Sequence, residues 1–238
     1  MKSLNKNIYI FSIKFSPGLF KEFYLIGKKL SSNNNVFYFI SENYKFLHKE
    51  FIKNQTQKQI FEFLFKSNNI KNIFLDTLQY IFFRKNNISS RFIKNKPDIV
   101  FIYNSHPINF LIFTLAKKIN PNCRNILFVH EPYRKEKRFF GFLGFFYFYL
   151  QEFFQSISFK KVQSVILPSP LAKKIFLSRY QWFRGNIYNV NLLLNDEPHV
   201  NLERKYFTFG GGLNKGKGLK EFIDLVNYTA IKKLDHKF

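Results

Sequence analysis

Short apolar runs alternate along most of the chain with longer segments whose apolar residues recur every three or four positions. The short runs are rich in Ile, Val and Phe, which is typical of strands buried in a parallel sheet. The longer segments have the period of helices that bury one face. This pattern predicts strands at 7–13, 36–40, 98–102, 125–129, 163–167 and 185–190. It predicts helices at 19–30, 107–119, 139–150 and 171–177.

The alternation is clearest between Lys96 and Pro132, which reads as strand, helix and strand. Two strands that are apolar throughout and joined by a helix predict a parallel pair with a right-handed crossover. In such sheets, ligands bind beyond the carboxyl ends of the strands. The residues expected there are Tyr103, Asn104, Ser105 and His106 after the first strand, and His130 and Glu131 after the second.

The stretch between Asn43 and Asn95 has the least regular pattern. Apolar residues from Phe46 to Phe65 suggest one or two helices. We expect a short strand at 73–75 and another helix at 78–83. We expect the whole to form an α/β domain, a Rossmann-like parallel sheet with helices on both faces.

Near the other end of the chain, a polar stretch with Pro198 suggests a linker, and 205–209 reads as a strand. A loop of glycines and lysines follows at 210–218, before an amphipathic helix at 219–232. Glycine lets the backbone approach a phosphate, free amides donate to it, and lysine adds positive charge. Gly211 to Lys217 also fits G-x-x-x-x-G-K, but Gly218 stands where a magnesium-binding Ser or Thr would follow.

Composition adds a strong positive charge to this picture. The formal net charge is +23, and 46% of the residues are hydrophobic, enough for a packed core. Two explanations of this charge are open. The protein has a selected basic face that binds nucleic acid or an anionic membrane, or its composition reflects the drift of an AT-rich genome. The single cysteine, Cys123, excludes an internal disulfide framework and a cysteine-based metal site, and no other cluster has metal-ligand spacing.

A basic cluster directly precedes a run of Phe and Tyr, a pattern typical of a segment at a membrane interface. The alternative is a buried helix with a high aromatic content. The uncharged apolar stretch 139–150 is too short to cross a bilayer, so we expect a cytoplasmic protein, peripheral on the inner membrane face. The predicted membrane-facing residues are Arg134, Lys135, Lys137, Arg138, Phe139 and Phe140.

Several motifs occur in order along nearly the whole chain. They are S-P-G after the first strand, P-D-I-V, V-H-E, V-I-L-P-S before a helix, and the final F-G-G-G-L-N-K-G-K-G-L-K-E-F-I. Together they resemble the retaining family 4 glycosyltransferases of the GT-B superfamily. The resemblance implies two Rossmann-like domains facing a cleft, a nucleotide-diphosphate sugar as donor substrate, and a cell-surface glycan or lipid-linked acceptor. It implies no further cofactor and no metal.

The resemblance also implies roles for individual residues. His130 matches the catalytic-site histidine that contacts the donor sugar, and Gly18 matches the turn that approaches the donor phosphate and the acceptor. Gly211 and Gly212 match the donor loop, and Lys217 matches the lysine that neutralises the diphosphate. Gly212 stands where the family has an arginine. Asn104, His106 and Glu131 fall on the acceptor side.

The predicted domains are an acceptor-side domain at 1–195, a linker at 196–204 and the start of a donor-binding domain at 205–238. The family's E-x7-E signature would come later than this, so the second domain is expected to be truncated and inactive alone. We expect residues after about Glu203 to be poorly anchored. Alternatives are a non-catalytic remnant, a subunit whose partner chain supplies the rest of the donor domain, and a basic nucleic-acid-binding protein.

Overall fold

The computed structural model describes residues 5–13, 17–45, 59–65, 80, 85–103, 106, 108–130, 142–190, 223–224 and 226–228. The chain divides into two compact units, residues 1–193 and 194–238. In the second unit, the described residues are helical and carry the exposed side chains of Ile223 and Tyr228.

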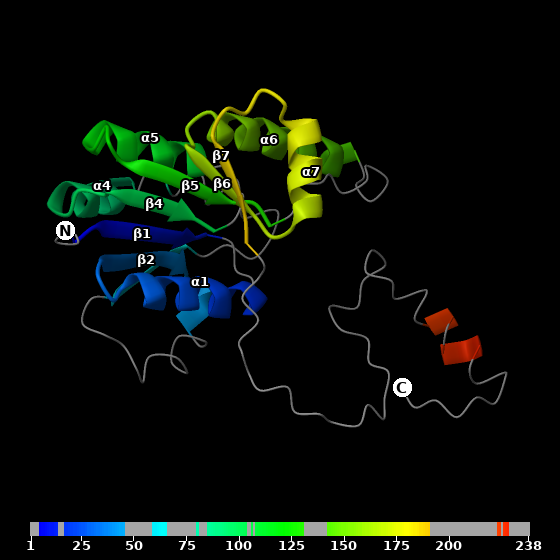
Figure 1. The fold of residues 1–238 in the computed structure, drawn as a ribbon, viewed down its shortest axis with the longest axis horizontal. Helices are drawn as coiled ribbons and strands as arrows, with labels where there is room; N and C mark the ends of the chain where they lie inside the picture. The colour runs from blue at the N-terminus through cyan, green and yellow to red at the C-terminus, as the bar shows by residue number, and fades with distance from the viewer. Residues whose placement is uncertain are drawn as a thin grey trace. The chain divides into compact units, whose positions relative to one another are not determined.

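The first unit alternates strands and helices along the chain (Figure 1). The strands are β1 (Asn7–Ser12), β2 (Asn35–Ser41), β3 (Gln59–Phe65), β4 (Ile99–Ile102), β5 (Arg124–Phe128), β6 (Ser164–Leu167) and β7 (Asn186–Asn189). The helices are α1 (Pro17–Leu30), α4 (Lys85–Lys94), α5 (Asn109–Ile119), α6 (Phe142–Phe159) and α7 (Pro170–Arg179), with a short 3₁₀ turn, η1, at Glu42–Tyr44.

All seven strands form one parallel sheet in the order β3-β2-β1-β4-β5-β6-β7. The order reverses at β1, because the chain first builds outward through β2 and β3 and then in the other direction from β4. This is the strand order of a doubly wound Rossmann-like sheet. The predicted fold class is therefore confirmed.

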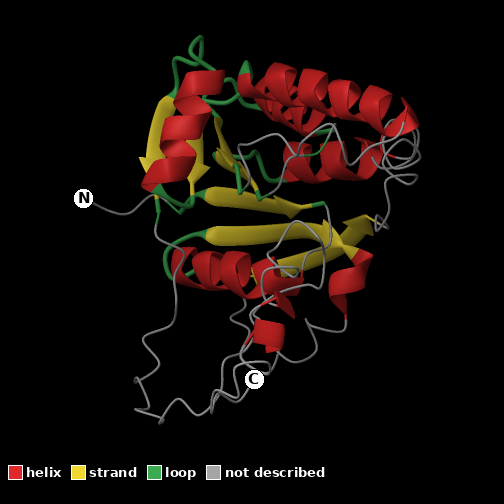
Figure 2. Ribbon diagram, turned by 90° about the vertical axis from the view of Figure 1, so that its right-hand side faces the viewer, coloured by secondary structure: helices red, strands yellow, loops and turns green. Residues whose placement is uncertain are grey.

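Helices lie on both faces of the sheet (Figure 2). Alternate residues of a strand point to opposite faces, so Ile8 and Ile10 belong to one core cluster, and Tyr9 and Phe11 to another. Helix α1 packs on the first cluster. Helices α4, α5, α6 and α7 pack on the second. Each core holds stacked rings, such as Tyr9 on Phe37 with centroids 4.6 Å apart.

Buried polar groups tie neighbouring elements together at the amino end of the sheet. The Asn7 backbone N–H donates to the Asp98 carboxylate at 2.8 Å, which links β1 to the start of β4. The buried Asn125 amide donates to the carbonyls of Phe113 and Lys161. Since a buried polar group without a partner is destabilising, these bonds favour one arrangement of α5, β5 and α6.

One predicted element is wrong. Ile60 to Phe65 was predicted as helix, whereas the structure has strand β3 there. A short apolar run fits a buried helix or a strand equally well, and pairing with β2 decides between them. The Phe61 ring stacks on Tyr38 with centroids 4.1 Å apart, while the Glu62 side chain pairs with α4.

Three further boundaries differ from the prediction. No helix was predicted over Lys85–Lys94, where α4 buries only Ile88 and Phe92 and leaves its third apolar residue, Ile93, exposed. Helix α6 continues to Phe159, beyond the predicted end at residue 150. Gly18, predicted in a turn, is the second residue of α1, because Pro17 is well suited to the first turn of a helix.

Candidate functional site

The candidate site is the carboxyl edge of the sheet where β1 and β4 lie side by side. From β1 the chain continues into α1 on one face, and from β4 it continues into α5 on the other. The two connections diverge, and a crevice outside the strand ends is the usual ligand site at such a reversal point. Both helix N-termini begin at this edge, where their backbone N–H groups favour anionic ligands.

On the β1 side, polar and aromatic groups form a buried support. The hydroxyls of Ser12, the last residue of β1, and Tyr44 are hydrogen-bonded at 3.2 Å. The centroid of the Tyr44 ring lies 5.3 Å from that of Phe20 and 5.4 Å from that of Phe23, and both phenylalanines belong to α1. The beginning of α1, with Gly18 at its second position, is therefore held against the strand ends by packing.

On the β4 side, Tyr103 directly follows the strand and is buried. Its hydroxyl donates a hydrogen bond to the Glu22 carboxylate of α1. Its ring stacks on Phe128, with centroids 4.5 Å apart. Burial first, and then the bond to Glu22, raise the pKa of the Tyr103 phenol well above its ordinary value. Tyr103 is therefore a hydrogen-bond donor at neutral pH and not a proton acceptor.

His106, predicted on the acceptor side, is only 4% exposed. Its Nδ1 accepts a hydrogen bond from the Ile108 backbone N–H at 3.3 Å, and its carbonyl accepts one from Asn109 N–H at 3.0 Å. A neutral ring that accepts at Nδ1 carries its proton on Nε2. The residue thus stabilises the beginning of α5 from inside the protein.

His130, the predicted catalytic-site histidine, is exposed two residues beyond the end of β5. Its ring centroid lies 6.2 Å from that of Phe128, which is stacked on Tyr103. Three aromatic rings therefore connect the ends of β4 and β5. The structure places His130 and Tyr103 at the same edge of the sheet.

The next strand along the sheet ends at a capped helix. The Ser169 Oγ accepts a hydrogen bond from the Ala172 backbone N–H at 3.1 Å, and Pro170 is the first residue of α7. Serine is a preferred N-cap residue, and proline is well suited to the first position of a helix. This arrangement brings a third helix N-terminus to the carboxyl edge of the sheet.

Sequence reasoning did not identify Ser12, Glu22 or Tyr44 as members of this site. A single serine that ends an apolar strand is a weak signal, although Ser12 is that residue in β1. Glu22 is one acidic residue on an amphipathic helix, a pattern typical of solvent-exposed positions. Only the packing of α1 onto the sheet brings its carboxylate to Tyr103.

The remaining predicted site residues lie outside the described residues. They are Asn104, Ser105, Glu131, Arg134, Lys135, Lys137, Arg138, Phe139, Phe140, Gly211, Gly212 and Lys217. Their predicted roles in acceptor contact, membrane contact and diphosphate binding stay predictions.

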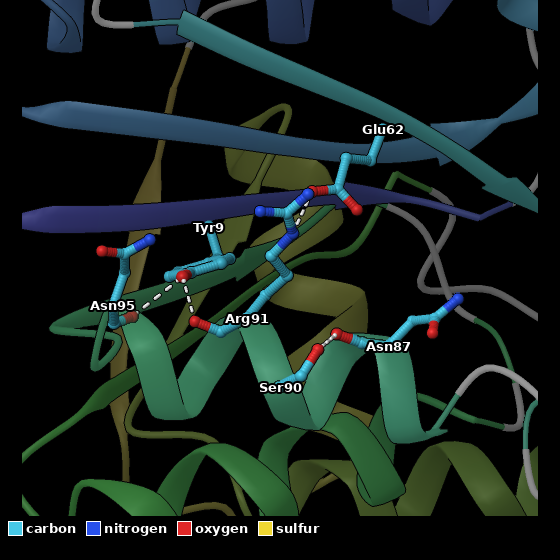
Figure 3. A network of polar contacts seen from close by, with 6 residues as sticks. All are labelled: Tyr9, Glu62, Asn87, Ser90, Arg91 and Asn95. Carbon is cyan, nitrogen blue, oxygen red and sulfur yellow. Dashed lines mark hydrogen bonds and ion pairs between the residues drawn. The ribbon is translucent and has the colours of Figure 1, made fainter.

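A second concave region, of about 390 Å³, lies between β3 and α4 and is polar (Figure 3). Glu62 and Arg91 form an ion pair there, with 2.6 Å between Oε1 and Nε. The Tyr9 hydroxyl donates to the carbonyls of Arg91 and Asn95. The Arg91 side chain is 45% exposed, so water screens this pair and its contribution to stability is small. We interpret the region as structural support for α4.

The described part of the chain also bears on metal binding and on membrane insertion. No group of three or more His, Cys, Asp or Glu side chains that could hold a metal ion occurs there. None of the helices found there combines the length and the apolar character needed to span a bilayer. Cys123 is a buried free thiol at the amino end of β5.

No model of a known protein family matches the chain, and no curated protein matches it. The solved structures to which it is similar include three described as UDP-N-acetylglucosamine 2-epimerases. One, from Listeria monocytogenes, is 14% identical in sequence and has a TM-score of 0.45. The match covers 74% of this chain and 42% of the epimerase chain. A second is 13% identical with a TM-score of 0.48, and the match covers 74% of this chain and 46% of the epimerase chain. The third, from Neisseria meningitidis and bound to UDP-GlcNAc, is 11% identical with a TM-score of 0.47, covering 73% and 43%. The chain thus spans less than half the length of each.

Proposed function

We propose that this chain binds a nucleotide-diphosphate sugar at the carboxyl edge of its sheet and takes part in transferring the sugar to a glycan or lipid-linked acceptor. The observation that carries the proposal is the reversal of strand order between β1 and β4, with the N-termini of α1 and α5 at the same edge. Helix N-termini favour the charge of a diphosphate. The family resemblance of the sequence motifs adds glycosyl transfer as the reaction.

In the proposed reaction, the bond between the anomeric carbon and the diphosphate oxygen breaks. A bond forms between that carbon and an acceptor hydroxyl oxygen, whose proton is released to water. The departing diphosphate gains negative charge, and Lys217 is assigned to neutralise it. His130, exposed at the strand edge, is assigned to contact the donor sugar.

A binding experiment tests the first part of the proposal. UDP-glucose, UDP-GlcNAc and GDP-mannose are titrated into the chain and followed by saturation-transfer NMR and calorimetry. We expect one of them to bind, and the variant His130→Ala to bind it about tenfold more weakly, since a polar contact to a ligand contributes about 1.4 kcal/mol.

Asn122→Ala is the matched control, because Asn122 is exposed in the turn before β5, at the amino end of the strand. It should bind like the unmodified chain. Absence of binding for all three nucleotides would contradict the proposal, as would equal binding by the His130→Ala variant.

Donor cleavage, with water in place of the acceptor hydroxyl, is tested separately by following release of the nucleoside diphosphate and of labelled free sugar. Release by the chain alone, lost in Lys217→Ala, would support glycosyl transfer by this chain. Donor binding without release would instead favour a subunit whose partner chain supplies the rest of the donor domain.

A further inference from the structure

The amino edge of the sheet, opposite the candidate site, is strongly basic. In a parallel sheet, the strands begin at this edge and the connecting helices end there. Backbone hydrogen bonds join the beginnings of neighbouring strands, such as Asn35 N–H to the Lys6 carbonyl and Arg124 N–H to the Asp98 carbonyl, each at 2.9 Å. Ten exposed basic residues belong to this edge. They are Lys6, Lys28, Lys29, Lys94, Lys96, Lys118, Arg124, Lys160, Lys161 and Arg184.

Few negative charges oppose these ten cations. In the described part of the chain, Asp98 is the one acidic residue at this edge, and its carboxylate already accepts a hydrogen bond from the backbone of β1. Helix carboxyl ends carry about −0.5 charge each, so the five described helices offset only about two or three of the positive charges. The ion pairs found among the described residues involve other basic groups, and join Glu62 to Arg91 and Glu152 to Arg179.

Helix stabilisation explains only part of this cluster. Lysine in the last turn of a helix interacts favourably with the helix dipole, and Lys28, Lys29 and Lys94 occupy such positions. This effect falls off within one turn. Lys6, Arg124 and Arg184 stand at the beginnings of β1, β5 and β7, outside the last turn of any described helix. Like charges gathered in this way repel one another, and a bound polyanion relieves that repulsion.

An exposed aromatic ring lies on the same edge. Trp182 belongs to the connection between α7 and β7, two residues from Arg184, and it is 42% exposed. Its ring is held edge-on against Tyr180, with 6.0 Å between the centroids. A cationic surface that also presents an exposed aromatic ring suits single-stranded nucleic acid, because cations contact the phosphates and the ring stacks on a base.

We propose that the amino edge binds single-stranded nucleic acid through its phosphates, with Trp182 stacked on one base. The beginnings of β2, β1, β4, β5, β6 and β7 form a continuous row of six strands. At about 4.8 Å between strands, this row is roughly 24 Å long. Phosphate contacts carry no sequence information, so the binding is independent of sequence. A membrane surface suits this edge less well, because the helices meet it end-on, whereas an interfacial helix lies in the membrane plane.

The salt dependence of binding tests the phosphate contacts. The probe is a fluorescein-labelled single strand of about 12 uridines, and fluorescence anisotropy measures its binding to the full chain at roughly 50–200 mM salt. Each neutralised phosphate contributes about 0.7 to the slope of log affinity against log salt. We expect the triple variant Lys96→Gln, Lys118→Gln and Arg124→Gln to lower that slope by about 2 and to bind roughly tenfold more weakly.

A second triple variant, Lys45→Gln, Lys85→Gln and Lys174→Gln, is the matched control. It removes the same net charge from three exposed lysines that lie away from the amino edge. It should bind the strand with the slope and affinity of the unmodified chain. A difference between the two triple variants therefore reports on the edge and not on the overall charge.

Trp182 provides a direct readout, because it is the only tryptophan of the chain. The oligonucleotide should quench its fluorescence, and the quenching should saturate at the concentration at which the anisotropy saturates. No folding defect affects this measurement, since it uses the unmodified chain. Trp182→Ala should bind about fivefold more weakly or worse, because one stacked base is lost.

Several results would overturn the proposal. Equal losses in the two triple variants would mean that the contact is non-specific, and binding without quenching of Trp182 would place the strand elsewhere. Displacement of the strand by UDP-GlcNAc would assign it to the carboxyl edge. Vesicles of equal parts phosphatidylglycerol and phosphatidylcholine that bind more tightly than the strand, with the same dependence on the edge variant, would assign the edge to a membrane.

Discussion

Buried phenol groups are frequent in this protein, and several carry a hydrogen bond to a backbone carbonyl or a carboxylate. The Tyr9 hydroxyl donates to two carbonyls of the α4 C-terminal region, and the Tyr103 hydroxyl donates to Glu22. Burial raises the pKa of Tyr9, Tyr38, Tyr80 and Tyr103 above the ordinary value of 10.0. These groups therefore stay neutral in the folded protein over the physiological range.

The buried thiol of Cys123 gives a pH dependence that can be isolated. Burial raises its pKa from 9.0 to about 11. The unfolded chain therefore loses this proton first, and the thiol's contribution to stability is complete below pH 9 and declines as the pH rises toward 11. Urea denaturation at half-unit steps from pH 7 to 10.5 should show this decline.

The variant Cys123→Ala isolates the thiol, since the other titrating groups are unchanged. The stability difference between the two proteins should be constant below pH 8.5 and should change in favour of the variant at higher pH. A difference that stays constant up to pH 10.5 would show that Cys123 is not buried as described. Slow reaction of the native thiol with iodoacetamide is a second readout.

At the scale of elements, the strongly apolar strands were predictable and the edge strand β3 was not. β1, β2, β4, β5 and β6 are short apolar runs rich in the β-branched and aromatic residues that are typical of strands. β3 is an edge strand whose run includes Glu62, and only its pairing with β2 and with Arg91 of α4 explains that residue. The site depends on the reversal of strand order at β1. That order is set by pairing between strands that are far apart in the sequence, so a local sequence pattern does not predict it.

Helix α1 lies so close to the sheet that one of its positions must be glycine. A Cβ on Gly27 would lie 1.8 Å from the Tyr38 hydroxyl oxygen and 2.4 Å from Cζ. Tyr38 is fully buried and stacked on Phe61, so its ring has little room to move. Gly27→Ala should destabilise the protein by about 1–3 kcal/mol from overpacking, despite a gain of about 1 kcal/mol in helix propensity.

Thermal denaturation followed by circular dichroism checks this expectation. Lys29→Ala, at an exposed position of the same helix, is the control and should change stability by less than about 0.5 kcal/mol. A Gly27→Ala protein that is more stable than the unmodified chain would contradict the close packing of α1 on β2.

The N-cap of α7 offers a second test at this scale. Ser169→Ala removes the bond from the Ala172 N–H and should lower the free energy of unfolding by about 1 kcal/mol. Ser178→Ala, which removes an exposed hydroxyl near the other end of the same helix, should have almost no effect. Equal losses for the two variants would indicate that the cap does not stabilise the helix.

At the scale of the molecule, the seven strands and two core clusters found among the described residues belong to residues 1–193. We expect this part to fold when expressed alone, because its sheet requires no described contact with later residues. It should unfold cooperatively in urea, with the circular dichroism of an α/β protein. An insoluble product, or one that unfolds without a cooperative transition, would show that later residues complete its core.

The central position of β1 also has a consequence for how the chain is made. β1 is synthesised first, but its neighbour β4 follows about 90 residues later, and the bond between Asn7 and Asp98 spans the whole interval. At roughly 5–20 residues per second, the ribosome needs on the order of 5–20 s to supply β4. During that time, a strand that is buried at the centre of the folded sheet has one edge unpaired. Newly made chains should therefore depend on chaperones that shield unpaired strands, and faster translation of residues 13–98 should raise the soluble yield.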